Sequence, residues 1–203
     1  TPHSTNTIDW SDNVQGMELA NFTTFEPIYQ SSCDVTDSYI DINIPADSFV
    51  IQDGIYNVVY AYVYLNSSNI EDNGVFSCMI DGDNHGFVAD PRGAQFIDDF
   101  SGDLISNDHT IEVTPTELQF VQNTTTVGVN TNMSPAPSVA FTDANGNIDL
   151  DLTTSPIEMT SIGSTLVGSP VSSTIDANGL ATFSSLSFSS TDTDVYLIAS
   201  DKD

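Results

Sequence analysis

Short apolar stretches separated by turn residues recur along the whole of this 203-residue chain. No segment keeps a helical apolar period for more than two turns, and the nearest candidate, Asn13–Phe22, contains Gly16. The strongest strand signal is Ile55–Leu65, which is rich in tyrosine and valine and follows a turn signal at Asp53–Gly54. Short strands at regular spacing are typical of a β-sandwich or barrel, so the sequence predicts an all-β chain.

The character of the sequence changes near Pro115–Glu117, which predicts a boundary between two domains, residues 1–116 and residues 117–203. Further strands are predicted in the first domain at Tyr39–Ile44, Val75–Ile80 and Asp108–Val113. Seven strands, the number in an immunoglobulin-like sandwich, are predicted in the second domain: Leu118–Val121, Ser138–Thr142, Ile148–Leu152, Ile157–Ser161, Val171–Ile175, Ala181–Phe188 and Asp194–Ala199.

Five motifs follow one another in the second half: L-Q-F at 118–120, T-V-G-V-N at 126–130, S-V-A-F-T-D-A-N-G-N at 138–147, D-A-N-G-L-A-T-F-S-S-L-S-F at 176–188 and D-V-Y-L-I-A-S at 194–200. In this order they resemble a bacterial immunoglobulin-like repeat (Big-type), a module of large secreted surface and adhesin proteins. In the first half, G-I-Y-N-V-V-Y and D-H-T-I-E-V are similar to a related β-sandwich module. The resemblance implies two tandem immunoglobulin-like β-sandwich domains with a scaffolding or adhesive role.

The charge balance is extreme, with 29 acidic residues against two basic ones, Arg92 and Lys202, and a formal net charge of −27. So few cations cannot neutralise the phosphates of nucleic acid or hold anionic lipid head groups, which excludes both as partners. No run of about 18 apolar residues occurs, so direct membrane insertion is not expected. Self-repulsion opposes compaction, so high salt, divalent cations or a polymeric setting is expected to offset it.

The segment Asp81–Asp103 is the densest polar region and provides a candidate calcium site. Calcium prefers hard oxygen ligands, which aspartate-rich loops supply. The candidate ligands are Asp81, Asp83, Asp90, Asp98, Asp99 and Asp103. The alternative is that these are turn residues between short strands, with Arg92 paired to a neighbouring aspartate and ordering the loop.

A second acidic pattern, D-x-N-x-N-x-D-x-D, spans Asp143–Asp151 and is similar to the start of an EF-hand loop. The twelfth position of such a loop needs a bidentate glutamate, and Thr154 stands there instead. A hairpin turn therefore explains the pattern better than a calcium site does.

The two cysteines, Cys33 and Cys78, are predicted to form a disulfide within the first domain. The alternatives are two separate buried thiols or a lone reactive cysteine. A reactive cysteine needs an electropositive neighbourhood to form its thiolate, and this chain has almost none. Two cysteines are also too few for a structural zinc site of the usual kind.

The sequence does not predict an enzyme. The three histidines, His3, His85 and His109, are far apart in sequence, and His3 lies in an N-terminal tail that is expected to be mobile. The metalloprotease motif H-E-x-x-H and the nucleophile motif G-x-S-x-G do not occur. The six glutamates, the commoner acid and base residues of glycosidases, are scattered along the chain.

Tyrosines at alternate positions of one predicted strand form a candidate binding face. Because strand residues alternate between two faces, Tyr60, Tyr62 and Tyr64 share one face, while Val59, Ala61 and Val63 share the core face. With Trp10, Tyr29 and Tyr56 they could form an aromatic platform for sugars. The alternative is that a neighbouring domain or subunit covers these rings.

The function expected from these features is a non-catalytic structural or adhesive segment of an extracellular surface protein or filament. Its expected partners are other copies or flanking domains of the same protein, and glycans; calcium is the one cofactor suggested. The first alternative is a carbohydrate-binding accessory module. The second is a subunit of an extracellular polymer, in which the tail Thr1–Trp10 pairs as an added strand with a neighbour.

Overall fold

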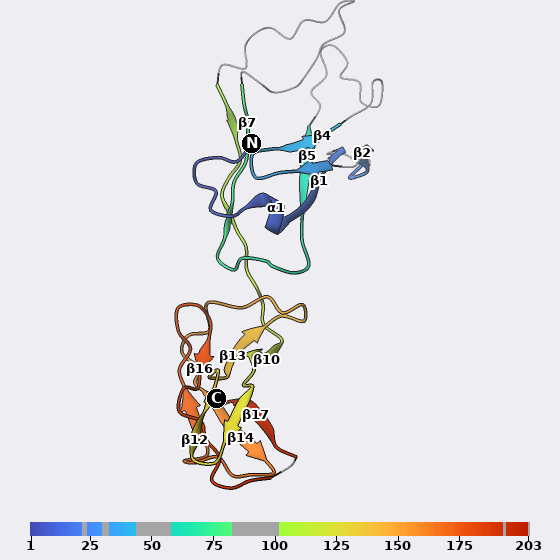
Figure 1. Cartoon of the computed structure of the whole chain (residues 1–203). Coiled ribbons are helices and arrows are strands. Elements are labelled where there is room, and N and C mark those ends of the chain that lie inside the picture. The colour runs from blue at the N-terminus through green and yellow to red at the C-terminus, as the bar shows by residue number, and fades with distance from the viewer. Residues whose placement is uncertain (22–23, 30–32, 44–57, 83–101, 193, 203) are drawn as a thin grey trace, which may run out of the picture. The chain divides into compact units, whose positions relative to one another are not determined.

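The computed structural model describes residues 1–21, 24–29, 33–43, 58–82, 102–192 and 194–202. In these residues the chain consists of antiparallel strand pairs and one helix of four residues (Figure 1). The prediction of an all-β chain is confirmed. No helix in these ranges is long and apolar enough to cross a membrane. The chain divides into two compact units, Thr1–Ile70 with Gly74–Ile111, and Glu71–Asn73 with Glu112–Asp203.

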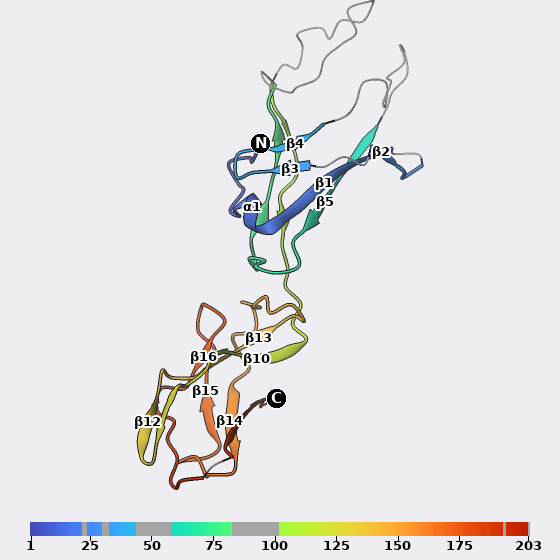
Figure 2. The same ribbon diagram turned by 45° about the vertical axis from the view of Figure 1, so that its right-hand side comes forward.

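The first unit is built around a three-stranded sheet in the order β2-β1-β5, whose strands β1 and β5 lie side by side in both views (Figures 1 and 2). Three further strand pairs, β3-β4, β6-β9 and β7-β8, complete its described part. Its elements are α1 (Trp10–Asn13), β1 (Val14–Asn21), β2 (Pro27–Tyr29), β3 (Cys33–Val35), β4 (Ile40–Ile42), β5 (Val59–Leu65), β6 (Val75–Phe76), β7 (Met79–Ile80), β8 (Leu104–Ile105) and β9 (His109–Thr110).

A small apolar core holds the first unit together, and Trp10 is its largest side chain. The core consists of Ile8, Trp10, Val14, Phe76 and Ile111. The rings of Trp10 and Phe76 stack with their centroids 5.2 Å apart, and the indole N–H donates a hydrogen bond of 2.8 Å to the Asn6 side-chain oxygen. Burying each large apolar side chain contributes about 1.5–3 kcal/mol to stability relative to leaving it exposed.

The second unit has two three-stranded sheets, in the orders β10-β13-β16 and β15-β14-β17, and a β11-β12 hairpin. Its strands are β10 (Glu117–Gln122), β11 (Thr126–Gly128), β12 (Thr131–Ser134), β13 (Ser138–Thr142), β14 (Ile157–Ile162), β15 (Val171–Ser173), β16 (Ala181–Thr182) and β17 (Tyr196–Asp201). One core joins the two sheets, because Val139 and Phe141 of β13 belong to the same buried cluster as Ile157 and Met159 of β14. The unit is therefore sandwich-like.

Two turns of the second unit share the sequence D-A-N-G and the same hydrogen bonds. In each turn the first aspartate carboxylate, of Asp143 or Asp176, accepts backbone N–H groups two and four residues ahead, at 2.8–3.1 Å. The glycine of each, Gly146 or Gly179, has a positive φ, which glycine adopts without strain. The segment Asp143–Asn147 is thus a turn, as predicted, with its carboxylate already satisfied by the backbone.

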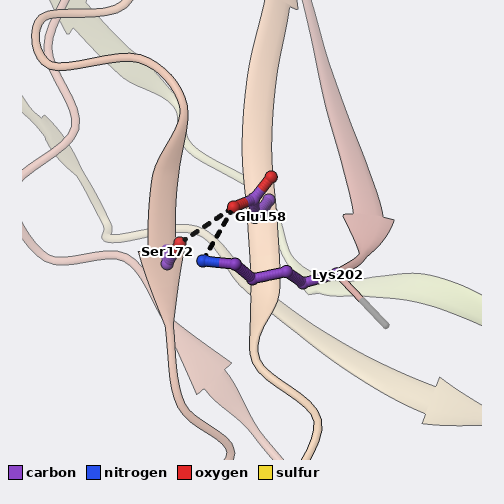
Figure 3. Close-up of polar contacts among 3 residues, drawn as sticks. All are labelled: Glu158, Ser172 and Lys202. Atoms are coloured by element: carbon purple, nitrogen blue, oxygen red, sulfur yellow. Dashed lines mark hydrogen bonds and ion pairs between the residues drawn. The ribbon is translucent and has the colours of Figure 1, made fainter.

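Lys202 forms the ion pair that is described for this chain (Figure 3). Its ammonium lies 3.2 Å from a carboxylate oxygen of Glu158, and the Ser172 hydroxyl donates a hydrogen bond of 3.4 Å to the same oxygen. Half of the lysine side chain is exposed, so solvent screens the attraction, and such surface pairs contribute about 0–1 kcal/mol. The pair joins neighbouring strands without deciding the fold.

Candidate functional site

The pairing of β1 with β5 places the three predicted tyrosines on one exposed sheet face. In the antiparallel register Tyr60, Tyr62 and Tyr64 lie directly opposite Ala20, Glu18 and Gly16. Directly opposite residues point to the same side of a sheet. The tyrosines are 37%, 41% and 48% exposed, whereas Ala20 is fully buried. Because Ala20 and Gly16 are small, the rings of the tyrosines opposite them, Tyr60 and Tyr64, form the surface of this side of the sheet.

The other face of β5 is less buried than the alternating pattern predicts. Val63 packs against the Trp10 core and Val59 is half-buried, but Ala61 is exposed, so its predicted core position is wrong. In the described part of the sheet β5 is an edge strand, and the core beneath it is small. An edge strand above a small core is covered over only part of its length.

Phe25 extends the tyrosine row, a position that no sequence pattern predicted. It lies in the turn between β1 and β2, is 63% exposed, and stacks on Tyr60 with a centroid distance of 5.9 Å and an interplanar angle of 12°. Tyr60 in turn lies 6.1 Å from Tyr62 at 47°. Phe25, Tyr60, Tyr62 and Tyr64 are called the aromatic face from here on.

The backbone of Phe25 is strained. Its φ of 56° is left-handed, a conformation that is unusual for a bulky residue and costs of the order of 1–3 kcal/mol. The Phe25 N–H donates a hydrogen bond of 2.8 Å to the Asn21 carbonyl, which fixes the turn in this conformation. Strained backbone of this kind clusters at functional sites, which makes the exposed Phe25 ring a candidate site residue.

Glu18 supplies the polar group beside the aromatic face. The Tyr64 hydroxyl donates a hydrogen bond of 2.9 Å to the Glu18 carboxylate, and this bond is the main reason that the pKa of Tyr64 is raised. The second carboxylate oxygen and the tyrosine hydroxyls add acceptors and donors to the ring surfaces. The face can therefore stack against a flat partner and hydrogen-bond its edges.

Trp10, which was also proposed for the platform, does not join it. Trp10 is 1% exposed and belongs to the core, which corrects the prediction that it contributes to a surface platform. Its large indole is buried against Phe76 in the core of a small unit, where burying so much apolar area is favourable. Tyr56 and the side chain of Tyr29 lie outside the described residues.

The N-terminal segment is held against Val75–Met79 by backbone hydrogen bonds and one isolated β-bridge, Pro2 to Cys78, which corrects the prediction of a mobile tail. The N–H of His3 donates to the Ser77 carbonyl and the N–H of Thr7 to the Val75 carbonyl, both at 3.0 Å. Ile8, at the end of this segment, is 3% exposed. The segment pairs with its own chain here, and pairing with a neighbouring copy stays a prediction.

His3 and His109, which are far apart from each other in the sequence, both lie close to Asp108. Hydrogen bonding by the Thr5 hydroxyl is the main cause of the lowered pKa of Asp108, and the charges of His3 and His109 contribute. His3 Nδ1 is 3.0 Å from the Thr5 hydroxyl, so the carboxylate contacts the hydroxyl directly rather than orienting the imidazole. In a catalytic triad the imidazole lies between the nucleophile and the carboxylate, whereas here the Thr5 hydroxyl lies between His3 and Asp108. His85 lies outside the described residues.

The proposed calcium ligands are described only in part. Asp81 and Asp103 flank the same end of the β7-β8 pair, and the Asp103 carboxylate accepts the N–H of Gly82 at 3.0 Å. The other four candidates, Asp83, Asp90, Asp98 and Asp99, lie outside the described residues, as does Arg92. Among the residues that are described, no three histidine, cysteine or acidic side chains could together hold a metal ion. Calcium binding stays a prediction.

The cysteines are not bonded to each other in the structure. Cys33 and Cys78 are both half-buried, and both belong to the first unit. Burial is the main cause of the raised pKa of the Cys33 thiol, which disfavours the reactive thiolate. The disulfide between them stays a prediction.

Asp72 is a buried carboxylate that no sequence pattern predicted. It is 4% exposed, and its two oxygens accept the N–H groups of Val113 and Leu150, each at 2.8 Å. Burial and the nearby carboxylates, Asp72 among them, raise the pKa of Glu112. No signal in the sequence separates Asp72 from the other aspartates, because its burial depends on contacts made across 41 and 78 positions.

Comparison with protein-family models, with curated proteins and with solved structures finds no match. The arrangement of residues in this chain is therefore the basis for its functional interpretation.

Proposed function

We propose that this chain is a non-catalytic structural and adhesive segment of an extracellular surface protein or filament, built from two immunoglobulin-like β-sandwich domains. The sandwich-like second unit and the order of its motifs support this interpretation. The second D-A-N-G turn and strand β16 carry the motif D-A-N-G-L-A-T, and strand β17 carries most of D-V-Y-L-I-A-S. Both are parts of the resemblance to a bacterial immunoglobulin-like repeat.

The observation that carries the proposal is the path of the chain between its units. The chain passes from one unit to the other three times, because Glu71–Asn73 belongs to the second unit while the residues on both sides belong to the first. Asp72 anchors this short excursion through its two backbone hydrogen bonds. A carboxylate that accepts buried N–H groups is costly to remove. Repeated chain passages suit a segment that must stay intact under tension.

The proposal is tested by locating the protein on intact cells of its source. An antibody raised against the folded chain is applied before and after permeabilisation, with a cytoplasmic protein as the control. Staining of intact cells, equal to that of permeabilised cells, is the expected result. Staining that needs permeabilisation would contradict an extracellular segment.

A further inference from the structure

The aromatic face has more exposed ring surface than isolated surface residues normally provide. Four rings lie in one row across β5 and the β1–β2 turn, and each is at least 37% exposed. Single exposed apolar residues are ordinary, but contiguous ones mark interaction sites. The ring of Phe25 lies nearly parallel to Tyr60 from a turn with left-handed backbone, and Phe25 belongs to neither of the two described core clusters.

The chemistry of the face suits the apolar faces and hydroxyl edges of sugars. A pyranose ring presents C–H groups that stack on aromatic faces, and its hydroxyls need donors and acceptors at the edges. The aromatic face supplies rings, tyrosine hydroxyls and the Glu18 carboxylate, which already accepts one hydroxyl at 2.9 Å. Tyrosine rings also lose little conformational entropy on binding.

Charge limits the class of glycan. The chain carries a net charge of −27, and the charged side chain identified at the face, Glu18, is acidic. Acidic polysaccharides would be repelled by this field, whereas neutral ones are not. Twofold pairing of the face with that of a second copy would bring the two Glu18 carboxylates toward each other, which is also unfavourable.

We propose that the aromatic face, with Glu18, is a binding site for an extended neutral polysaccharide. Phe25 and Tyr60 form its flat part, Tyr62 continues the row, and the Tyr64–Glu18 pair receives sugar hydroxyls. This inference rests on the adhesive role proposed above and gives that role its ligand class.

Affinity electrophoresis in native gels tests the site directly. The chain is run through gels with hydroxyethyl cellulose, with galactomannan, with the acidic analogue carboxymethyl cellulose, or with no polymer. At least one neutral polymer should slow the wild-type chain, and carboxymethyl cellulose should not. Tyr62→Ala should weaken the retardation, with the dissociation constant rising about tenfold or more.

Two further variants separate loss of binding from loss of folding. Phe25→Gly removes a ring, but glycine tolerates the positive φ, so the fold should persist while binding weakens. Tyr196→Ala removes a ring that is 63% exposed on the second unit, and should bind as the wild type does. Circular dichroism checks that each variant is folded.

Three results would overturn the site. The first is no retardation by either neutral polymer, and the second is equal retardation of the wild type, Tyr62→Ala and Phe25→Gly. The third is a dimer in solution that Tyr62→Ala dissociates, which would assign the face to a second copy. Each leaves the surface location untouched, because antibody staining of intact cells decides that separately.

Discussion

Glycines at turns of the second unit show how single residues are constrained by their surroundings. Gly168 and Gly179 have similar positive φ angles, of 78° and 73°. A Cβ at Gly179 would lie 2.5 Å from Ile148 Cγ2 and 2.9 Å from the Asp149 carbonyl oxygen, whereas one at Gly168 would meet nothing within 4 Å. The two positions therefore share the backbone cost of substitution and differ in the steric cost.

Replacing Gly179 by alanine should destabilise the protein by about 2–4 kcal/mol, because left-handed strain adds to a steric clash. Gly168→Ala should cost about 1–2 kcal/mol, since it adds the strain alone. Denaturant unfolding of both variants measures the difference. Equal losses for the two would show that the Gly179 turn can move away from Ile148.

The aromatic face shows how far single residues can be predicted. Alternation along one strand correctly placed Tyr60, Tyr62 and Tyr64 on a common face, because the side-chain period of a strand is local. Phe25 could not be found in this way, since its ring reaches Tyr60 through a turn 35 positions earlier in the chain. Trp10 was misplaced because sequence does not reveal which aromatic residue fills the core.

At the scale of elements, the D-A-N-G turns tie stability to pH. Burial alone would raise the pKa of Asp143, but hydrogen bonds from Asn147 and Asn145 outweigh it and lower the pKa. Backbone hydrogen bonds from Leu180 and Asn178 lower the pKa of Asp176. A lowered folded-state pKa stabilises the protein above the unfolded pKa of about 4, and that contribution is lost as pH falls through the folded value.

Replacing both turn aspartates by alanine should therefore destabilise the protein more at pH 6 than at pH 3. Comparing the wild type with the Asp143→Ala, Asp176→Ala variant at each pH cancels the general effect of acidifying so acidic a chain. Urea unfolding at the two pH values gives the two differences. A difference that stays constant between them would mean that the ionised carboxylates do not hold the turns.

Predicted strands match observed ones where local pattern and pairing agree. Ser138–Thr142 is β13 with both ends correct: the apolar run Val139–Phe141 is flanked by Ser138 and Thr142, and all five residues are buried. The predicted strand Val75–Ile80 is divided into β6 and β7, which pair with different partners, β9 and β8. Asn13–Phe22, the nearest approach to a helical period, instead contains β1, since pairing with β5 outweighs local preference. Long-range pairing of this kind is not encoded in a short window.

The whole molecule has a net charge of −27, and its chain passes between the two units three times. The chain has 29 acidic residues and two basic ones, so ion pairs can offset little of the repulsion between the acidic side chains. The two described cores and the hydrogen bonds of Asp72 act against it. Asp37 offers a matched comparison in the first unit, because its carboxylate also accepts a backbone N–H, from Ser11 at 3.0 Å, but lies at the surface.

Pulling single molecules by residues near both ends tests the mechanical role most directly. The wild type should unfold in two separate force-resisting events, one for each unit. Asp72→Ala should lower the force of the event that belongs to the second unit, since Val113 and Leu150 lose their hydrogen-bond acceptor, whereas Asp37→Ala should leave that event unchanged. A wild-type chain that extends without a resisting event, or an Asp72→Ala variant as strong as the wild type, would contradict the account.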